Sequence, residues 1–232
     1  MSKVYKHIFF DLDHTLWDFD TNSKHTLWDL FLKYKFPDKL KNNFEAFYKK
    51  FLEVNFIYWE KYRTGQISKD QLRTERFPLI FNSFDFFDET IIQQVAADYV
   101  IYGPQKSGLI DFARELLDYL NNKYSLHIIT NGFTEVQYIK MQSSGIFSSF
   151  KEIITSENAG FKKPHAGIFN YALNSISANP NQCLMIGDEL HVDILGAKNA
   201  GIDQVYFNPK GLIHNQVVSY EVRSLKEIFN II

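Results

Sequence analysis

Two aspartates follow the first apolar run of the chain, at a spacing that suits metal-assisted chemistry. Asp11 and Asp13 come directly after residues 4–10, which are β-branched or aromatic and typical of a buried strand. Two carboxylates at such a strand end are costly unless a cation neutralises them, and Mg²⁺ prefers oxygen ligands. One carboxylate is also a candidate nucleophile toward a phosphoryl group. An Asp-x-Asp pair standing alone would instead favour a turn or a helix cap.

Two later apolar runs end in groups that suit phosphate. Thr130 ends the run 126–130 and Asn131 follows it, and a hydroxyl with an exposed backbone amide can bind phosphate oxygens. Lys163 follows the run 152–155 and precedes a helical pattern, where its charge can balance a phosphate. Taken singly, each of these motifs is better explained as an ordinary turn or a solvated lysine.

The run 183–186 ends in a further pair of acidic residues. Gly187 permits a close backbone approach, Asp188 offers a metal ligand, and Asp193 can cap the next helix or support the site. The carboxyl ends of neighbouring parallel strands share one sheet edge, so four such strand ends would meet there. The combination predicts a Mg²⁺-dependent phosphoryl-transfer site.

The elements that must position these residues follow a βαβ pattern. A fifth strand is predicted at residues 204–207. Helical patterns separate the later strands, at residues 134–143, 165–174 and 192–200. This alternation predicts an α/β fold with a doubly wound, Rossmann-like parallel sheet.

A helical insert of about 85 residues interrupts this pattern after the first strand. Residues 17–103 show no strand pattern and contain helical candidates at 21–34, 41–64 and 89–102, with a capping box at Ser68 and Gln71. An insert at this point is expected over the carboxyl ends of the strands, where ligands bind in open α/β sheets. We therefore predict a catalytic core at 1–16 and 104–232 and a helical cap at 17–103.

Aromatic residues are concentrated in the insert. Residues 17–102 hold 21 of the 38 aromatic residues, including all three Trp. A small helical bundle needs bulky side chains for its core, which accounts for most of them. A few are candidates for stacking on a nucleobase.

The ordered motifs resemble the haloacid dehalogenase superfamily of hydrolases, in the form with a helical cap inserted after the first motif. The matching segments are FDLDHTL at 10–16, ITNGF at 129–133, SENAGFKKPHAGIF at 156–169 and IGDELHVDILGAKNAG at 186–201. They occur in the order found in the superfamily and span nearly the whole predicted core.

The resemblance implies a role for each motif residue. It implies that Asp11 is the nucleophile and Asp13 the general acid and base. Thr130 and the Asn131 amide would hold the phosphoryl oxygens, and Lys163 would be the motif lysine, with Lys162 a bystander. It further implies that Asp188 binds Mg²⁺ together with Asp11 and the Asp13 carbonyl, and that Asp193 supports the site. The resemblance assigns no role to His14 or His191.

The residue at position 13 separates the activities within the superfamily. Dehalogenases lack an aspartate there, whereas an ester leaving group requires a general acid, so the expected activity is that of a phosphomonoesterase. The DHTLW start, TNGFTEVQ and SENAG most resemble the pyrimidine 5′-nucleotidase branch. A sugar-phosphate phosphatase or phosphomutase remains the alternative, and a non-enzymatic phospho-acceptor domain is a remote one.

Two arginines of the insert are substrate-binding candidates. Arg63 lies near a loop between helices that resembles the region reaching into the site in capped relatives, and Arg76 lies further along the insert. Solvated helix charges are the more ordinary interpretation of each.

Composition limits the partners and the setting. The chain of 232 residues has 27 acidic and 25 basic residues, giving a net charge of −2, so neither a nucleic acid polymer nor a membrane surface is an expected partner. A single cysteine, Cys183, and the lack of a signal-peptide or membrane-span pattern favour the cytoplasm. The expected partner is a small phosphate monoester, bound by a monomer or small homo-oligomer.

Overall fold

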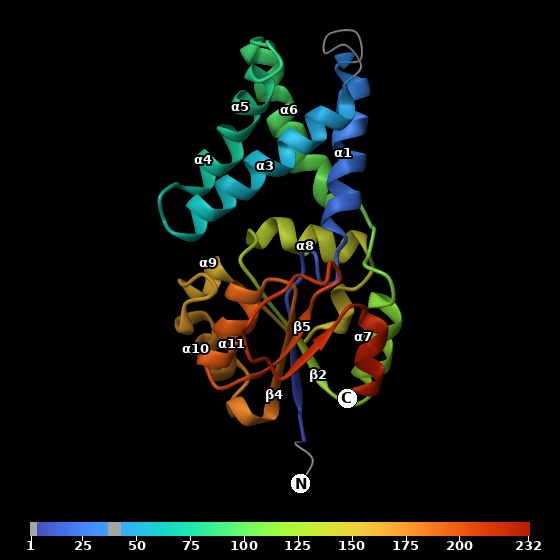
Figure 1. Ribbon diagram of the computed structural model, residues 1–232, viewed down its shortest axis with the longest axis vertical. Coiled ribbons are helices and arrows are strands. Elements are labelled where there is room, and N and C mark those ends of the chain that lie inside the picture. Colours follow the sequence, from blue (N-terminus) through green and yellow to red (C-terminus); the bar gives the residue numbers. More distant parts are fainter. Residues whose placement is uncertain (1–3, 37–42) are drawn as a thin grey trace. The chain divides into compact units, whose positions relative to one another are not determined.

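The computed structural model describes residues 4–36 and 43–232, which form two compact units. The first unit runs to residue 19 and resumes at residue 107, and the second comprises residues 20–106. The first contains a sheet flanked by helices, and the described part of the second is helical (Figure 1). The role of the helical unit as a cap stays a prediction.

The sheet is a six-stranded parallel sheet in the order β3-β2-β1-β4-β5-β6. Its strands are β1 (His7–Phe10), β2 (Ser125–Thr130), β3 (Glu152–Thr155), β4 (Cys183–Gly187), β5 (Asp203–Phe207) and β6 (Tyr220–Val222). The predicted doubly wound α/β core is confirmed. Phe10 pairs in register with Ile128 of β2 and Ile186 of β4, so the residues after these strands emerge at the same edge.

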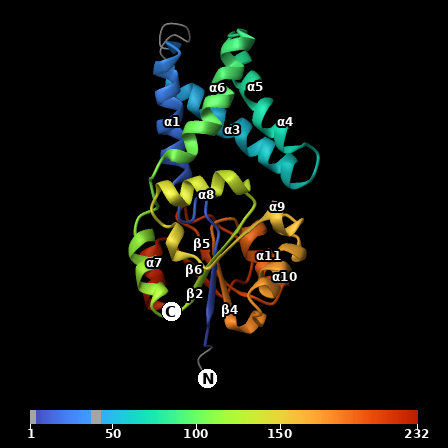
Figure 2. The same cartoon turned by 180° about the vertical axis from the view of Figure 1, so that it is seen from behind.

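Alternate residues of β1 enter two separate hydrophobic cores. Ile8 and Phe10 belong to the first core, which helix α7 (Ala113–Asn121) and the 3₁₀ segment η5 (Leu225–Asn230) complete. Phe9 belongs to the second, with helices α10 (Ala166–Ser175) and α11 (Leu195–Asn199). The strand is apolar throughout because both faces are covered. Figures 1 and 2 show α7 and α10 on opposite sides of the sheet.

The predicted helices of the core lie close to their expected positions. Helix α8 (Thr134–Ser143) matches its prediction. Helix α10 begins one residue later than predicted because the His165 side chain caps it, accepting from the Gly167 amide. Residues predicted as one helix at 192–200 instead form a π-helical turn, η4 (Leu190–Ile194), followed by α11. A short helix, α9 (Ser156–Ala159), follows β3 directly.

The helical unit is held together largely by aromatic side chains. Its elements are α1 (Phe19–Lys33, of which Phe19 is grouped with the first unit), α3 (Phe44–Arg63), α4 (Lys69–Thr74), α5 (Arg76–Asn82), α6 (Glu89–Tyr102) and η1 (Gly103–Gln105). Residues 41 and 42 of the predicted 41–64 helix lie outside the described residues. The Ser68–Gln71 capping box is present. Six buried phenylalanines form its centre: Phe31, Phe36, Phe47, Phe51, Phe77 and Phe81.

The chain leaves the sheet-containing unit and returns to it through neighbouring backbone segments. Trp17 forms an antiparallel bridge with Leu109. The Ile110 amide donates to the Leu16 carbonyl at 2.9 Å, and the Asp18 amide donates to the Gly108 carbonyl at 3.1 Å. These contacts hold the two crossings side by side within the first unit.

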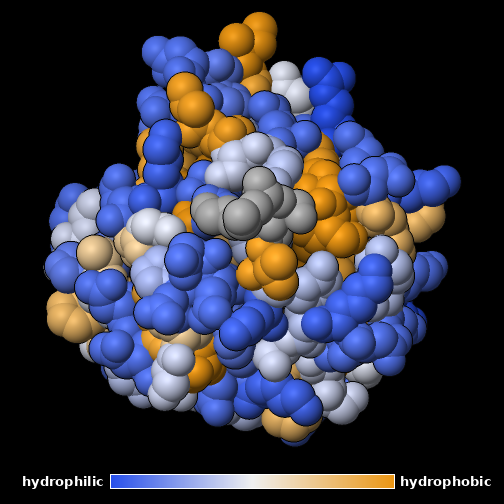
Figure 3. Space-filling view, turned by 90° about the horizontal axis from the view of Figure 1, so that it is seen from below, coloured by the Kyte–Doolittle hydropathy of each residue, from blue (hydrophilic) through white to orange (hydrophobic). Residues whose placement is uncertain are grey.

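None of the helices in the described part of the chain is long and apolar enough to cross a membrane. The face in Figure 3 is mainly hydrophilic, with apolar residues in small patches. Scattered apolar residues are normal on protein surfaces, and the larger apolar sets of this chain lie in its cores.

Two histidines meet at the start of the sheet. His7 Nδ1 lies 3.2 Å from His127 Nε2, and the His127 ring packs beside Phe9. His127 is 2% exposed. Burial, with a smaller contribution from His7, lowers the pKa of His127 to about 4. The neutral imidazole is therefore the form that the folded protein accommodates.

Because the folded protein holds His127 in its neutral form, we expect the protein to lose stability in mild acid. Between pH 6.5 and about 4 the unfolded chain binds a proton that the folded chain excludes at His127, so the free energy of unfolding falls as pH decreases through this window. The contribution of His127 to this loss at pH 5 is about 2 kcal/mol. Urea unfolding at pH 7.5 and 5 should show a smaller pH dependence in His127→Phe, but not in His25→Gln, which alters an exposed histidine of α1.

Candidate active site

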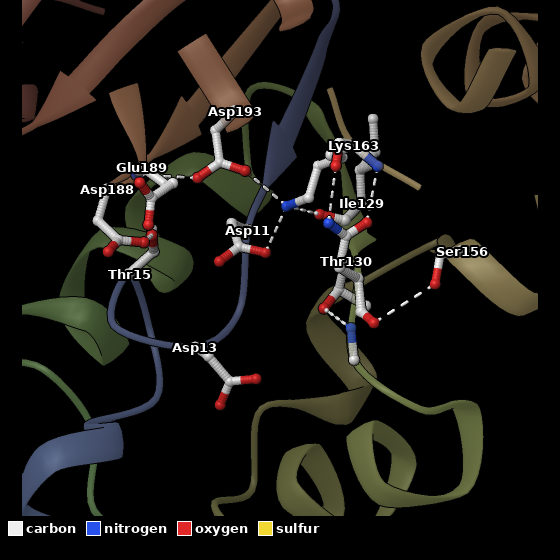
Figure 4. Close-up of polar contacts among 12 residues, drawn as sticks. Asp11, Asp13, Thr15, Ile129, Thr130, Ser156, Lys163, Asp188, Glu189 and Asp193 are labelled. Carbon is white, nitrogen blue, oxygen red and sulfur yellow. Dashed lines mark hydrogen bonds and ion pairs between the residues drawn. The ribbon is translucent and has the colours of Figure 1, made fainter. Parts of the chain in front are cut away.

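The carboxyl edge of the sheet gathers the predicted site residues of the first unit. Asp11 and Asp13 follow β1, Thr130 ends β2, and Asp188 follows β4. Two further residues, Lys163 before α10 and Asp193 within η4, point toward Asp11 (Figure 4). Parallel strands in close register therefore bring together groups that are up to 182 residues apart in sequence.

Lys163 connects three of these elements. Its ammonium lies 2.6 Å from Asp11 Oδ1, 2.6 Å from Asp193 Oδ1 and 2.7 Å from the Ile129 carbonyl. Lys163 is only 2% exposed, and burial alone would lower its pKa. The charges of Asp11 and Asp193 outweigh that effect and raise the pKa, so the lysine is held as a cation. The contacts with Asp11 and the Ile129 carbonyl are hydrogen bonds, and the contact with Asp193 is an ion pair.

Three carboxylates lie close together at this site. Oxygen atoms of Asp11, Asp188 and Asp193 lie within 4.8 Å of one another. Burial raises the pKa of Asp11, and so do the charges of Asp193 and Asp13, against the opposing effect of Lys163. Burial also raises the pKa of Asp188 well above its ordinary value, with repulsion from Asp193 and Asp11 adding to it. Fully ionised, the three carboxylates and the lysine carry a net charge of −2, which suits a divalent cation.

The contacts of the three acidic residues differ. Asp193 accepts from the Glu189 amide at 3.0 Å and pairs with Lys163, so both of its oxygens are engaged. Asp188 accepts from the Thr15 hydroxyl at 3.1 Å through Oδ1. This arrangement fits Asp11 and Asp188 as metal ligands and Asp193 as a supporting group.

Gly187 is required for the position of Asp193. A Cβ at residue 187 would lie 2.6 Å from both Cβ and Oδ2 of Asp193. Such distances are not tolerated, so any larger residue would displace the carboxylate that holds Lys163.

Thr130 and Asn131 are held in different ways. The Thr130 hydroxyl oxygen accepts from the Gly132 amide at 3.0 Å and from Gln137 Nε2 at 2.7 Å. Its own proton is then left to donate to another acceptor. The Asn131 side chain accepts from the Lys163 amide at 2.7 Å and donates to the Lys163 carbonyl at 2.9 Å. It therefore fixes the lysine loop to the end of β2.

Asp13 has partners from α8. Lys140 Nζ lies 2.5 Å from Asp13 Oδ1, and Gln137 Nε2 donates to Asp13 Oδ2 at 2.9 Å. Burial would raise the pKa of Asp13, but the charge and hydrogen bond of Lys140 and the hydrogen bond of Gln137 together lower it. The carboxylate form is thus favoured in this arrangement.

Comparison with models of known protein families shows the family of this chain. The family model for haloacid dehalogenase-like hydrolases matches residues 5–201. The chain belongs to this family.

Two curated relatives match this haloacid dehalogenase-like hydrolase over nearly its whole length. The HAD-hydrolase YfnB of Bacillus subtilis is 32% identical over 99% of this chain and 96% of its own. The pyrimidine 5′-nucleotidase PynA of Streptococcus pneumoniae is 32% identical over 97% of this chain and 94% of its own.

A solved structure of one relative supports the same assignment. The crystal structure of YfnB, described as bound to magnesium, has a TM-score of 0.86 at 31% identity and covers 99% of both chains. A dehalogenase structure with a TM-score of 0.78 is only 18% identical, and this likeness shows the fold alone.

The arginines of the helical unit differ from each other. Arg63 forms an ion pair with Glu60, one turn earlier on α3, and its role in substrate binding stays a prediction. The interpretation of Arg76 as a solvated charge is wrong, because the residue is 4% exposed and its side chain donates to Asn55. Its guanidinium also lies 5.9 Å from the centre of the Tyr99 ring, so the aromatic core of the unit encloses it.

Several residues that support the site were missed from the sequence. They are Thr15, Gln137, Lys140 and the side chain of Asn131. A signal existed for two of them, since Gln137 and Lys140 are three residues apart on the helix that follows the Thr130 motif and so share a face.

Proposed function

We propose that this haloacid dehalogenase-like hydrolase is a Mg²⁺-dependent phosphomonoesterase that forms an aspartyl-phosphate on Asp11. The observation that carries the proposal is the juxtaposition of Asp11 with Lys163, with Asp13 two residues further on. Asp11 supplies a nucleophile, and Asp13 supplies the proton that an oxygen leaving group needs. The curated relatives include several phosphatases, which supports the same reaction class.

In the first step, a carboxylate oxygen of Asp11 forms a bond to phosphorus. The bond from phosphorus to the ester oxygen breaks, and Asp13 gives that oxygen its proton. The dianionic phosphate favours the protonated form of Asp13 at this stage, because a nearby negative charge raises the pKa of a carboxyl group. Lys163 holds the second oxygen of Asp11 and offsets the negative charge.

In the second step, Asp13 acts as a base. It takes a proton from water, and the water oxygen attacks phosphorus while the bond to Asp11 breaks. Phosphate leaves and the Asp11 carboxylate is regenerated. The contacts of Asp13 with Lys140 and Gln137 favour the ionised form that this step requires.

The acidic group would hold the metal. Mg²⁺ bound by the Asp11 and Asp188 carboxylates and the Asp13 carbonyl would reduce the repulsion between the substrate and the attacking carboxylate. The Thr130 hydroxyl and the Asn131 amide are proposed to bind the phosphoryl oxygens.

The relatives support a nucleotide as substrate. Two pyrimidine 5′-nucleotidases, PynA and YjjG of Escherichia coli, match 97% and 91% of this chain and so include the helical unit. The glyceraldehyde 3-phosphate phosphatase of Methanothermobacter thermautotrophicus is 39% identical but matches only 40% of the chain. We therefore propose pyrimidine nucleoside monophosphates as substrates, with Arg63 of the helical unit among the residues that contact them.

A substrate screen tests this proposal. Phosphate release from nucleoside monophosphates and sugar phosphates should be fastest with pyrimidine nucleotides and should stop when EDTA removes the metal. A sugar phosphate that is hydrolysed clearly faster would contradict the nucleotidase assignment. Conversion of a sugar phosphate to its isomer faster than phosphate release would indicate a mutase, and turnover in EDTA would contradict the metal requirement.

A further inference from the structure

One face of α8 engages both oxygens of the Asp13 carboxylate. Lys140 lies 2.5 Å from Oδ1 and Gln137 donates to Oδ2 at 2.9 Å. The two donors are three residues apart and therefore lie on the same side of the helix. A carboxylate held at both oxygens has a defined orientation, and Asp13 is the group whose orientation toward the leaving oxygen matters in the proposed reaction.

The Lys140 side chain contacts two residues of the turn that carries Asp13. Lys140 is 7% exposed, and its ammonium lies 4.4 Å from the centre of the Trp17 ring. Trp17 is bridged to Asp13, and its carbonyl accepts from the His14 amide at 3.0 Å. The ammonium therefore contacts a carboxylate and an aromatic face from one turn, which favours burial of its charge.

Gln137 connects Asp13 to the predicted phosphate site. Its Nε2 donates to Thr130 Oγ1 at 2.7 Å as well as to Asp13, so both amide protons are used. Among the described residues, Gln137 Oε1 is buried without a hydrogen-bond partner. Leaving an acceptor unpaired is costly, so this side chain is oriented by its two donor contacts. One amide group thereby links Thr130 and Asp13.

Gly132 lies directly against the Gln137 side chain. A Cβ at residue 132 would lie 2.9 Å from Gln137 Cγ and closer still to Cδ and Nε2. Any residue other than glycine would push the Gln137 side chain away from Asp13 and Thr130. The glycine of the TNG motif therefore leaves space for Gln137.

We propose that Gln137 and Lys140 are positioning residues that orient the Asp13 carboxylate for proton transfer to the leaving oxygen, and that Gly132 keeps the place of Gln137 open. The inference rests on the proposed function, since it takes Asp13 as the general acid. Simple attachment of α8 to the β1 turn is the alternative role, and it would affect all substrates alike.

Dependence on the leaving group separates these roles. The value of kcat/KM covers the steps up to departure of the leaving group, and an acidic phenol departs without help whereas an alcohol needs a proton. Gln137→Met and Lys140→Met should lower kcat/KM by about 10²-fold or more for an alkyl phosphate, but by about 10-fold or less for nitrophenyl phosphate. Lys140→Arg should recover part of the loss, and Gln142→Met, on the exposed side of α8, should change neither value.

Equal losses for both substrates, or no loss, would overturn the proposal. Thermal melting checks that each variant is folded. If Lys140→Met does not fold, Gln137→Met carries the test, since it removes no charge. A wild-type protein that hydrolyses neither substrate would refute the proposed function itself, which is a distinct result from an active enzyme whose leaving-group dependence is unchanged by the substitutions.

A double-variant experiment tests the part played by Gly132. In the wild-type background, Gly132→Ala should lower kcat/KM for an alkyl phosphate by about 10-fold or more, because Gln137 is displaced. In the Gln137→Ala background the same change should cost less than about 2-fold, because the colliding atoms are gone. Losses that multiply independently in the two backgrounds would show that Gly132 acts apart from Gln137.

Discussion

Asp11→Asn is expected to reduce hydrolysis of aryl phosphates and nucleoside monophosphates by at least about 10³-fold. Asparagine keeps the size of the side chain but lacks the carboxylate oxygen that would attack phosphorus. Phosphate release at saturating Mg²⁺ measures the loss. Acid quenching during turnover of a labelled substrate should place the label on Asp11 in the wild type and on no residue in the variant.

The fold should tolerate this substitution. Burial raises the pKa of Asp11, and repulsion from Asp193 and Asp13 adds to this effect, so a neutral residue there avoids both costs in the absence of metal. Lys163 keeps its ion pair with Asp193 in the variant. The melting temperature of Asp11→Asn should not fall below that of the wild type. Asp118→Asn, an exposed change on α7, is the matched control and should keep full activity. Turnover by Asp11→Asn near the wild-type rate would exclude Asp11 as the nucleophile.

Lys163→Met should lower both stability and activity. The lysine is the cation between Asp11 and Asp193, and breaking a buried ion pair on one side costs about 3–5 kcal/mol. In EDTA, urea unfolding should therefore show a loss near the lower end of that range. Activity should fall by about 10²-fold or more, because the charge that offsets the substrate and Asp11 is gone.

Magnesium distinguishes this effect from a simple packing defect. Millimolar Mg²⁺ should stabilise Lys163→Met more than the wild type, because the metal would be the remaining cation among the carboxylates. Lys162→Met is the neighbouring control and should cost less than about 1 kcal/mol. Equal effects of the two substitutions would contradict the assignment of Lys163 as the motif lysine.

The sheet and the predicted site residues along it could be inferred from the sequence for one physical reason. Parallel strands covered on both faces consist of short apolar runs. The polar residues that follow these runs lie at the same edge of the sheet. The sequence therefore predicts that Asp11, Thr130 and Asp188 lie close together despite their separation along the chain. The resemblance to a family then added roles that the spacing alone left open.

Other parts of the structure carried weaker signals. The strand β6 has only three residues, two of them exposed, so it lacks the apolar run of a central strand. The π-helical turn of η4 depends on contacts such as that of the Asp193 carboxylate with the Glu189 amide, which no local pattern displays. Gln137 and Lys140 look like ordinary polar residues of an amphipathic helix until the fold places Asp13 against them.

The helical unit carried a misleading signal at Arg76. A charged residue at the start of a short helix normally faces water, so the pattern indicated a solvated side chain. Its burial depends on Asn55 and Tyr99, which approach it from other helices of the unit. Such long-range partners cannot be deduced from helical spacing.

The paired crossings at Leu16 and Ile110 have an evolutionary consequence. Because the chain departs and returns through adjacent hydrogen-bonded positions, the 87 residues from 20 to 106 can diverge, or be exchanged for those of a relative, without altering the register of any strand. If the helical unit is the predicted cap and contacts the substrate, the choice of substrate can then change while the reaction chemistry is kept. A lineage could acquire new substrates by replacing an interchangeable part while inheriting its catalytic apparatus unaltered.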